Sequence, residues 1–238
     1  MKNIKQKKTM KLAALFTGGK DSTYAIYLAK QQGHEIACLI TMKSENPHSY
    51  MFHTPAIELT KLQAEAMELP IFFGKTKGEK EKELLDLEKT IRKAKEKYDF
   101  MGLVTGALFS EYQKSRIEKI AQELRLKVLS PLWQKSQEEE IKELLDNNFE
   151  VIITAIAGEG LNESWLGKKL DQQMLNKLTD INKRVGINIA FEGGEAESLV
   201  VDCPLFKKKI KIIKFQKVMD SANSGRIIVK NAELMNKK

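Results

Sequence analysis

Residues Leu12 to Tyr24 (LAALFTGGKDSTY) constrain the fold more than any other stretch of the sequence. The apolar run from Leu12 to Phe16 predicts a buried strand, and an amphipathic helix is expected from Tyr24 to Lys30. The two glycines of the connecting turn let the backbone approach a ligand closely, and the free N–H groups that open a helix attract anions. The turn is therefore predicted to bind a phosphate group.

Six residues of this turn are candidate nucleotide ligands: Thr17, Gly18, Gly19, Lys20, Asp21 and Ser22. Lys20 adds a positive charge, while the hydroxyl and carboxylate groups offer helix caps or further ligand contacts. An ordinary strand-to-helix connection is the simpler interpretation of two glycines alone. The spacing fits neither GxxxxGK[ST] nor GxGxxG. It resembles the SGGxDS signature of the PP-loop ATP pyrophosphatases, which split ATP between the α and β phosphates, with Thr17 in place of the usual serine.

Composition agrees with an intracellular enzyme that binds no membrane. The 238 residues include 40 Lys+Arg and 32 Asp+Glu, a net charge of +8. Because no Lys/Arg block is interleaved with aromatic residues, this charge is weak evidence for RNA, and we do not expect direct nucleic-acid binding. Cys38 and Cys203 lie in apolar segments, expected to be strands, and predict neither a disulfide framework nor a zinc site. No apolar run is long enough to span a membrane, and we do not expect the basic stretch from Met1 to Lys11 to be a secretory signal.

The rest of the first half repeats strand and helix patterns. This alternation predicts an α/β fold with a doubly wound parallel sheet and right-handed crossovers, which in PP-loop proteins is the adenine nucleotide alpha hydrolase-like fold. The expected strands are 34–41, 70–73, 100–105 and 127–129, and the expected helices are 56–68, 79–97 and 112–124. The charged run from Lys75 to Lys97 is interpreted as a solvated helix face.

Ligands of such sheets bind at the carboxyl ends of the strands, where the strand order reverses. The first and fourth strands are expected to be neighbours there, so the segment that begins at Gly106 should face the phosphate turn. Ser110, Tyr112 and Arg116 follow, and the last two share one helix face. We predict that these four residues add phosphate and base contacts, although a glycine turn with Ser110 as an N-cap is an equal alternative.

A change of composition after Pro131-Leu132-Trp133 predicts a second, smaller α+β domain. We place the nucleotide-binding domain at residues 1–133 and the smaller domain at 134–238. With no linker between them, the two are expected to pack closely. The second half is predicted to contain helices at 137–147 and 170–185, a strand at 150–156, and a hairpin of 210–215 and 226–229 around a polar loop.

An acidic turn, Glu192-Gly193-Gly194-Glu195-Ala196-Glu197-Ser198, leads into an apolar strand of this half. A charged turn is often only solvated. The functional alternative is a carboxylate cluster that binds an ammonium group or magnesium, or supplies a general base. Glu195 and Glu192 are the candidates for a catalytic role, in that order, and Glu197 is expected to point to solvent.

Motifs in both halves together resemble the diphthine–ammonia ligases, over roughly Lys11 to Phe206. These motifs are TGGKDS, Glu45-Asn46-Pro47, Ser49-Tyr50-Met51-Phe52-His53-Thr54-Pro55, Gly106 through Tyr112-Gln113 to Arg116, Pro131-Leu132-Trp133, Trp165-Leu166-Gly167 and GGEAES with Asp202 and Pro204. The family carries an aromatic residue and usually threonine where this chain has Ala196 and Ser198, a departure that bears on substrate contacts. The length, without long extra domains, is typical of the archaeal form.

The resemblance implies a two-step reaction on translation elongation factor 2 in the cytoplasm. The carboxylate of diphthine, a histidine derivative with a trimethylammonium group, attacks the α-phosphorus of ATP, and ammonia then displaces AMP to give diphthamide. It implies catalytic roles for Lys20 and Asp21, and Mg²⁺ near Asp21. Tyr112 or Trp165 is a candidate aromatic partner of the trimethylammonium group, although Trp165 is more simply a core residue. The sequence does not define the oligomeric state, and a homo-oligomer is one of the alternatives.

Two other functions remain open at this point. A tRNA-modifying PP-loop enzyme fits the positive charge, but its sulfur-transferring members need paired catalytic cysteines. A regulator that only binds ATP or AMP fits the phosphate turn equally well. Turnover of ATP distinguishes the regulator from both enzymes.

Overall fold

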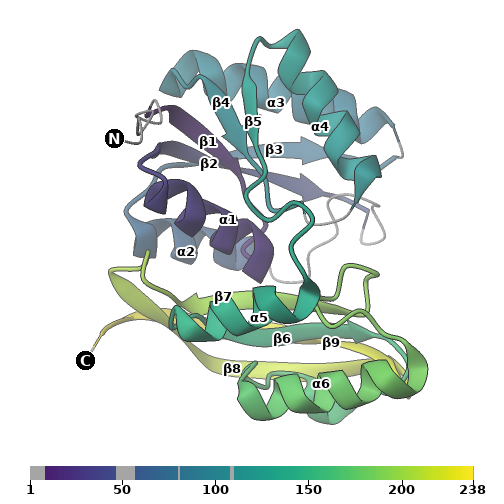
Figure 1. Cartoon of the computed structure of the whole chain (residues 1–238). Helices are drawn as coiled ribbons and strands as arrows, with labels where there is room; N and C mark the ends of the chain where they lie inside the picture. Colours follow the sequence, from purple (N-terminus) through teal and green to yellow (C-terminus); the bar gives the residue numbers. More distant parts are fainter. Residues whose placement is uncertain (1–8, 47–56, 80, 108–109, 238) are drawn as a thin grey trace, which may run out of the picture.

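Two β-sheets with their helices form the molecule (Figure 1). The computed structural model describes residues 9–46, 57–79, 81–107 and 110–237. Within these residues, the first sheet has five parallel strands in the order β3-β2-β1-β4-β5. The second has four antiparallel strands in the order β7-β6-β9-β8. The predicted parallel sheet and the second α+β unit are both confirmed.

The first sheet follows the predicted alternation of strands and helices. Leu12, Ala13 and Ala14 of its central strand are completely buried, because a parallel sheet is covered on both faces. The elements are β1 (Lys11–Leu15), α1 (Lys20–Gln31), β2 (Glu35–Ser44), the short 3-10 helix η1 (Ile57–Leu59), α2 (Thr60–Met67), β3 (Ile71–Thr76), α3 (Lys82–Tyr98), β4 (Gly102–Val104), α4 (Glu111–Glu123) and β5 (Lys127–Leu129). Helix α1 begins four residues before the predicted Tyr24.

The strand order reverses at β1, as predicted. Ala14 of β1 lies opposite Leu39 of β2 on one side and opposite Val104 of β4 on the other. The connections that follow β1 and β4 therefore leave the sheet at the same edge, which is where ligands of doubly wound sheets bind.

The second sheet is built from the remaining strands, with helices α5 and α6 packed against it (Figure 1). Its elements are α5 (Gln137–Asp146), β6 (Glu150–Ala157), the 3-10 helix η2 (Glu163–Trp165), α6 (Gln172–Val185), β7 (Ala196–Asp202), β8 (Lys208–Ser221) and β9 (Ser224–Asn236). The predicted hairpin is confirmed, but its strands are much longer than expected, and its turn consists only of Ala222 and Asn223.

Helices α1 and α5 pack the two halves against each other. The Tyr24 hydroxyl donates to a carboxylate oxygen of Glu143 at 2.6 Å, and the Tyr27 hydroxyl donates to the side-chain oxygen of Asn147 at 2.8 Å. The ring of Phe149 contacts both tyrosine rings edge-on. One hydrophobic core runs through both halves, which confirms the predicted close packing.

Several other expectations can be compared with the described residues. Cys38 lies in β2, whereas Cys203 follows the end of β7 and was wrongly expected in a strand. Both are free, and burial raises the pKa of each thiol to about 12. Trp165 is a buried core residue, as the simpler interpretation predicted. Pro47 and the motif from Ser49 to Pro55 lie outside the described residues. No described helix is both long and apolar enough to cross a bilayer.

Candidate functional site

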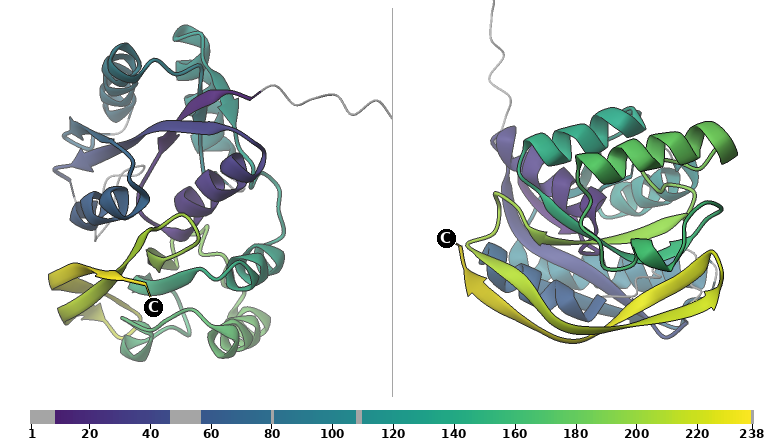
Figure 2. Two further views of the ribbon diagram at one scale, coloured as in Figure 1. Left: turned by 90° about the vertical axis from the view of Figure 1, so that its left-hand side faces the viewer. Right: turned by 90° about the horizontal axis from the view of Figure 1, so that it is seen from below.

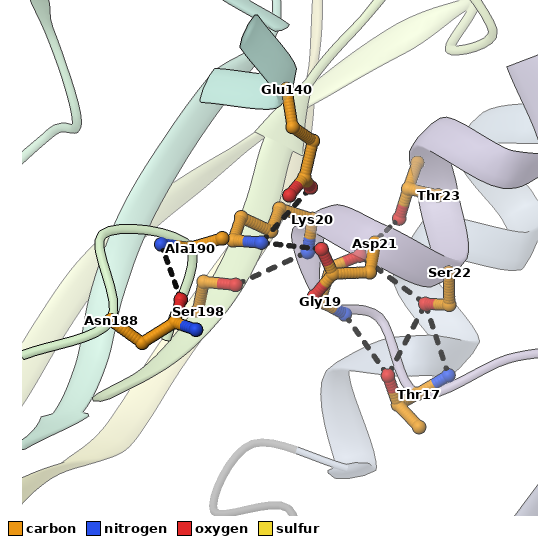
Figure 3. Close-up of polar contacts among 10 residues, drawn as sticks. All are labelled: Thr17, Gly19, Lys20, Asp21, Ser22, Thr23, Glu140, Asn188, Ala190 and Ser198. Carbon is orange, nitrogen blue, oxygen red and sulfur yellow. Dashed lines mark hydrogen bonds and ion pairs between the residues drawn. The ribbon is translucent and has the colours of Figure 1, made fainter. Parts of the chain in front are cut away.

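The phosphate turn connects β1 to α1 at the edge where the strand order reverses. Figure 3 shows its polar contacts. Gly18 has φ +84°, a left-handed conformation that favours glycine. Its carbonyl accepts the side-chain amide of Gln63 at 2.8 Å and the backbone N–H of Val200 at 3.1 Å. The hydroxyls of Thr17 and Ser22 lie 3.2 Å apart, and the Thr17 N–H donates to Ser22 Oγ at 3.3 Å. The turn is thus fixed by its own hydroxyls, by α2 and by β7.

The N-terminus of α1 is capped from the other half of the chain. Gly19, at the N-cap position, supplies no side-chain cap. Instead, the backbone N–H of Lys20 donates to Ser198 Oγ in β7 at 3.1 Å. Ser198 is one of the two positions at which the sequence departs from the resembled family, and it retains a hydroxyl at the helix end. The acidic turn and the phosphate turn therefore meet, although they are distant in sequence.

Gly106 lies directly against the phosphate turn, as predicted from the strand order. A Cβ atom on Gly106 would lie 2.6 Å from the backbone carbon of Asp21 and 2.7 Å from the Ser22 nitrogen. These distances are shorter than any normal contact, so only glycine fits here. The β4–α4 connection and the phosphate turn together form the edge of the candidate site.

The other three residues predicted after β4 have different immediate roles. Ser110 caps α4, because its Oγ accepts the Gln113 N–H at 3.3 Å, as the alternative interpretation held. The Tyr112 hydroxyl and the Arg116 guanidinium bind the same oxygen of Glu81 at 2.9 and 2.8 Å. Tyr112 and Arg116 therefore contact the residue that precedes α3 and have no described contact with the phosphate turn. Their contribution to ATP binding stays a prediction.

Lys20 is completely buried between two carboxylates (Figure 3). Its ammonium group forms an ion pair with Asp21 and a second, at 3.0 Å, with Glu140 of α5. Burial alone would lower the pKa of Lys20, but the two carboxylates outweigh it and raise the pKa above its usual value. The ammonium is therefore charged, and it links the phosphate turn to the second half of the chain.

Glu140 is the site residue that sequence reasoning missed. It is completely buried, and its Oε2 has no hydrogen-bond partner among the described residues. Burial, together with the nearby charge of Asp21, raises the pKa of Glu140 to about 9. In the sequence it is one of three consecutive glutamates in an acidic helix. One feature of the sequence could have identified it: Glu140 lies four residues before the apolar Leu144, and this spacing places both residues on the same, buried face of the helix.

The three glutamates of the acidic turn have different surroundings. The Glu195 carboxylate accepts the N–H groups of Asn188 at 2.8 Å and Gly193 at 2.9 Å, so it closes its own turn. Glu192 is half-buried. Glu197 is half-buried, so the expectation that it simply points to solvent is not met; burial, and secondarily the charge of Asp21, raises the pKa of Glu197 to about 7. Glu197 is the member of the turn whose charge interacts with Lys20 and Asp21.

Comparison with known proteins identifies the family. Residues 10–128 match the model of the diphthamide synthase N-terminal domain, and residues 136–235 match that of the diphthamide synthase C-terminal domain. The chain belongs to the diphthamide synthase family. It is 36% identical to the diphthine–ammonia ligase of Bos taurus over 237 residues, covering 90% of this chain and 87% of that protein.

Other members of the diphthamide synthase family are similar along the same length. The diphthine–ammonia ligase of Homo sapiens is 35% identical, with the same coverage of 90% and 87%. That of Schizosaccharomyces pombe is 34% identical over 217 residues, covering 84% of this chain and 36% of the longer relative. The similarity includes both halves that contribute to the candidate site.

The buried carboxyl groups make stability depend on pH in a defined direction. A carboxyl whose pKa is raised by folding binds its proton more tightly in the folded state, so stability falls as pH rises from the unfolded pKa to the folded pKa. Without nucleotide, we expect the free energy of unfolding to fall between pH 5.5 and 8.5 by on the order of 2 to 4 kcal/mol, mainly through Glu140. Denaturant titrations at both pH values measure this.

The matched variants for this experiment are Glu140→Gln and Glu139→Gln. Glutamine resembles a protonated Glu140 but cannot ionise, so the first variant should lose most of the pH dependence. Glu139 is exposed on the same helix, so its variant should behave as the unmodified protein. Equal pH dependence in all three proteins would contradict the assignment of a buried, protonated Glu140.

Proposed function

We propose that this protein uses ATP and ammonium to convert the carboxylate of diphthine, in a protein substrate, into the amide. The carboxylate oxygen attacks the α-phosphorus and releases pyrophosphate. Ammonia then attacks the acyl carbon of the adenylate, AMP leaves, and one proton is released. The observation that carries the proposal is the contact between the phosphate turn and β7, because the reaction requires ATP and the second substrate to meet. The family models match both halves of the chain that form the candidate site, which supports the proposal.

The phosphate turn supplies the proposed ATP site. The N-terminus of α1 and the backbone of Gly18 and Gly19 suit a triphosphate, because helix N-termini and close glycine backbone attract phosphate oxygens. Thr17 and Ser22 would add hydroxyl contacts. Gly106 has no side chain and therefore lets the β4–α4 connection lie against the phosphate turn. Lys20 is already bound to two carboxylates, so we propose that it orients Asp21 in addition to offsetting charge.

Magnesium fits the carboxylates around Asp21. The described residues contain no group of three His, Cys, Asp or Glu side chains that could hold a metal by themselves. Mg²⁺ commonly binds through one or two carboxylates together with phosphates and water, so Asp21 with a bound nucleotide is a suitable site. The unpartnered oxygen of Glu140 and the raised pKa of Glu197 indicate a site that accommodates more positive charge. When bound, the ion would stabilise charge on the leaving pyrophosphate.

The acidic turn is proposed to serve the second substrate. We propose that Glu197, whose charge interacts with Lys20 and Asp21, binds a cation near the phosphate turn, either the incoming ammonium or the trimethylammonium group of diphthine. Glu195 maintains the shape of the turn through its two backbone hydrogen bonds, and Glu192 stays a candidate for substrate contact. We further propose elongation factor 2 as the substrate, the cytoplasm as the location, and the division into domains at residues 133 and 134.

The products of turnover test this function. Incubation with ATP, ammonium and diphthine-bearing elongation factor 2 should yield AMP and pyrophosphate in equal amounts, together with an amidated factor. Chromatography of the nucleotides and mass spectrometry of the factor measure both. ADP with orthophosphate would exclude adenylation, and ATP binding without turnover would favour a regulator.

A further inference from the structure

The net positive charge of the chain resides in its C-terminal hairpin. Residues 1–206 contain 30 Lys+Arg and 30 Asp+Glu, whereas residues 207–238 contain 10 Lys+Arg and only 2 Asp+Glu. The first 206 residues are therefore neutral overall, and the last 32 account for the whole charge of +8. Such a separation of charge creates a local field that attracts anionic surfaces.

The hairpin is a long curved ribbon at the outside of the molecule (Figure 2). Strands β8 and β9 comprise 14 and 13 residues, and β8 is an edge strand of its sheet. One face of the ribbon packs inward: Ile210 and Ile227 are buried, and Ile212 lies in an apolar cluster with Leu59. The alternation of side chains then turns the intervening residues outward.

We call the outward residues Lys211, Ile213, Lys214, Ile228 and Lys230 the outer hairpin face. All five are exposed, with Ile213 at 45% and Ile228 at 37%. The register supports the grouping: it shifts between Ile212 and Lys214 and again between Lys214 and Phe215, and such bulges let consecutive residues lie on one face. Beyond the bulges, Gln216 lies opposite Ile228. The face thus combines free positive charge with exposed aliphatic side chains.

The hairpin's two acids leave most of this charge unpaired. Asp220 pairs with Arg226 at 2.8 Å. Glu233 lies opposite Lys211 on the neighbouring strand, but the described residues show no ion pair to Lys211, Lys214 or Lys230. Lysine often protects an exposed edge strand from pairing with another chain. That explanation does not cover Lys230, which belongs to the inner strand β9, nor the exposed Ile213 and Ile228. A binding surface accounts for all three.

The side chains of the face favour an acidic protein over a nucleic acid. Nucleic-acid surfaces use aromatic side chains for stacking and arginines for base and phosphate contacts. Phe215 is the hairpin's one aromatic residue, and its ring lies so close to Gly167 that a Cβ there would be 2.6 Å away. The single arginine is already paired with Asp220. Exposed aliphatic residues beside lysines instead suit a protein partner whose acidic surface complements the positive charge.

We propose that the outer hairpin face docks an acidic surface of the protein substrate. This inference rests on the proposed function, which requires a protein that presents one modified side chain to the site. Strand β8 contacts β7, whose Ser198 contacts the phosphate turn. A standard interface covers about 800 Å² of each partner, wide enough to include two neighbouring strands. The hairpin would steer and hold the substrate while the site reacts.

The test compares two triple charge reversals. The first variant carries Lys211→Glu, Lys214→Glu and Lys230→Glu; the control carries Lys93→Glu, Lys119→Glu and Lys177→Glu, which are exposed lysines of α3, α4 and α6. Fluorescence anisotropy with labelled diphthine-bearing elongation factor measures the Kd without requiring turnover. At low salt, the hairpin variant should bind at least about tenfold more weakly than the control, and the difference should shrink as salt rises.

Further measurements separate the possible outcomes. The Kd for ATP and the melting temperature should be equal in the two variants, which excludes misfolding as the cause. Equal Kd values for the factor would overturn the docking proposal. Binding of the unmodified protein to a 30-nucleotide single-stranded RNA and to anionic vesicles is measured as well. If one of these binds more tightly than the factor, and the hairpin variant loses this binding while it binds the factor normally, the docking proposal is overturned in favour of that partner. Failure of the proposed function appears separately, as factor binding without amidation.

Discussion

Replacing Lys20 by alanine should lower the free energy of unfolding by about 3 to 5 kcal/mol, which is the usual cost of breaking a buried ion pair from one side. The substitution leaves Asp21 and Glu140 close together in the interior without their shared ammonium group. It also removes the hydrogen bond from the ammonium group to Glu140, which links α1 to α5. Urea unfolding at pH 7 measures the loss.

Lys30→Ala is the control for this prediction, because Lys30 is exposed on the same helix. Its effect should be about 0.5 kcal/mol or less, as for most surface substitutions. If Lys20→Ala cost as little as the control, Lys20 could not be a buried partner of two carboxylates. The assignment of Lys20 as the buried partner of Asp21 and Glu140 would then be wrong.

Gly106→Val should weaken ATP binding and slow amidation by on the order of a hundredfold or more. The new side chain would overlap the backbone of Asp21 and Ser22, which cannot rotate away as a flexible side chain can. Either the phosphate turn or the β4–α4 connection must shift, and a displacement of about 1 Å commonly costs about a hundredfold in rate. Calorimetric titration with a non-hydrolysable ATP analogue measures the binding.

Gly33→Ala serves as the destabilised control. Gly33 has φ +85°, so alanine is strained there, but a Cβ meets no other atom within 4 Å, and the residue lies between α1 and β2, away from the phosphate turn. This variant should melt at a lower temperature yet bind ATP normally. Loss of ATP affinity in both variants would indicate general destabilisation instead of a local effect at the turn.

The parallel sheet and its ligand-binding edge were predictable because they depend on local sequence patterns. The apolar strand before Thr17 and the alternating segments define the βα units. The reversal of strand order at β1 then follows from general rules of chain connection and brings Gly106 to the phosphate turn. Ser110 as an N-cap was also predictable, since a cap depends only on its immediate neighbours.

The contacts between the halves were not predictable in the same way. Ser198 caps a helix that begins 178 residues earlier, and Glu140 pairs with a lysine 120 residues away. No periodicity in the sequence specifies such pairs. Glu197 was misjudged for the same reason, because a glutamate in a Gly-rich turn looks solvated until the neighbouring helix is placed. We therefore propose Glu197 as a further candidate for substrate contact beside Glu195 and Glu192, whose predicted roles stay predictions.

The most direct measurement follows the oxygen atoms of the reacting carboxylate. Diphthine-bearing elongation factor labelled with ¹⁸O in that carboxylate is incubated with the protein, ATP and ammonium, and the nucleotide product is analysed by mass spectrometry. An acyl-adenylate transfers one carboxylate oxygen to phosphorus, so the account predicts AMP that contains one ¹⁸O atom and an amide that retains the other. Unlabelled AMP, or ADP as the product, would contradict it.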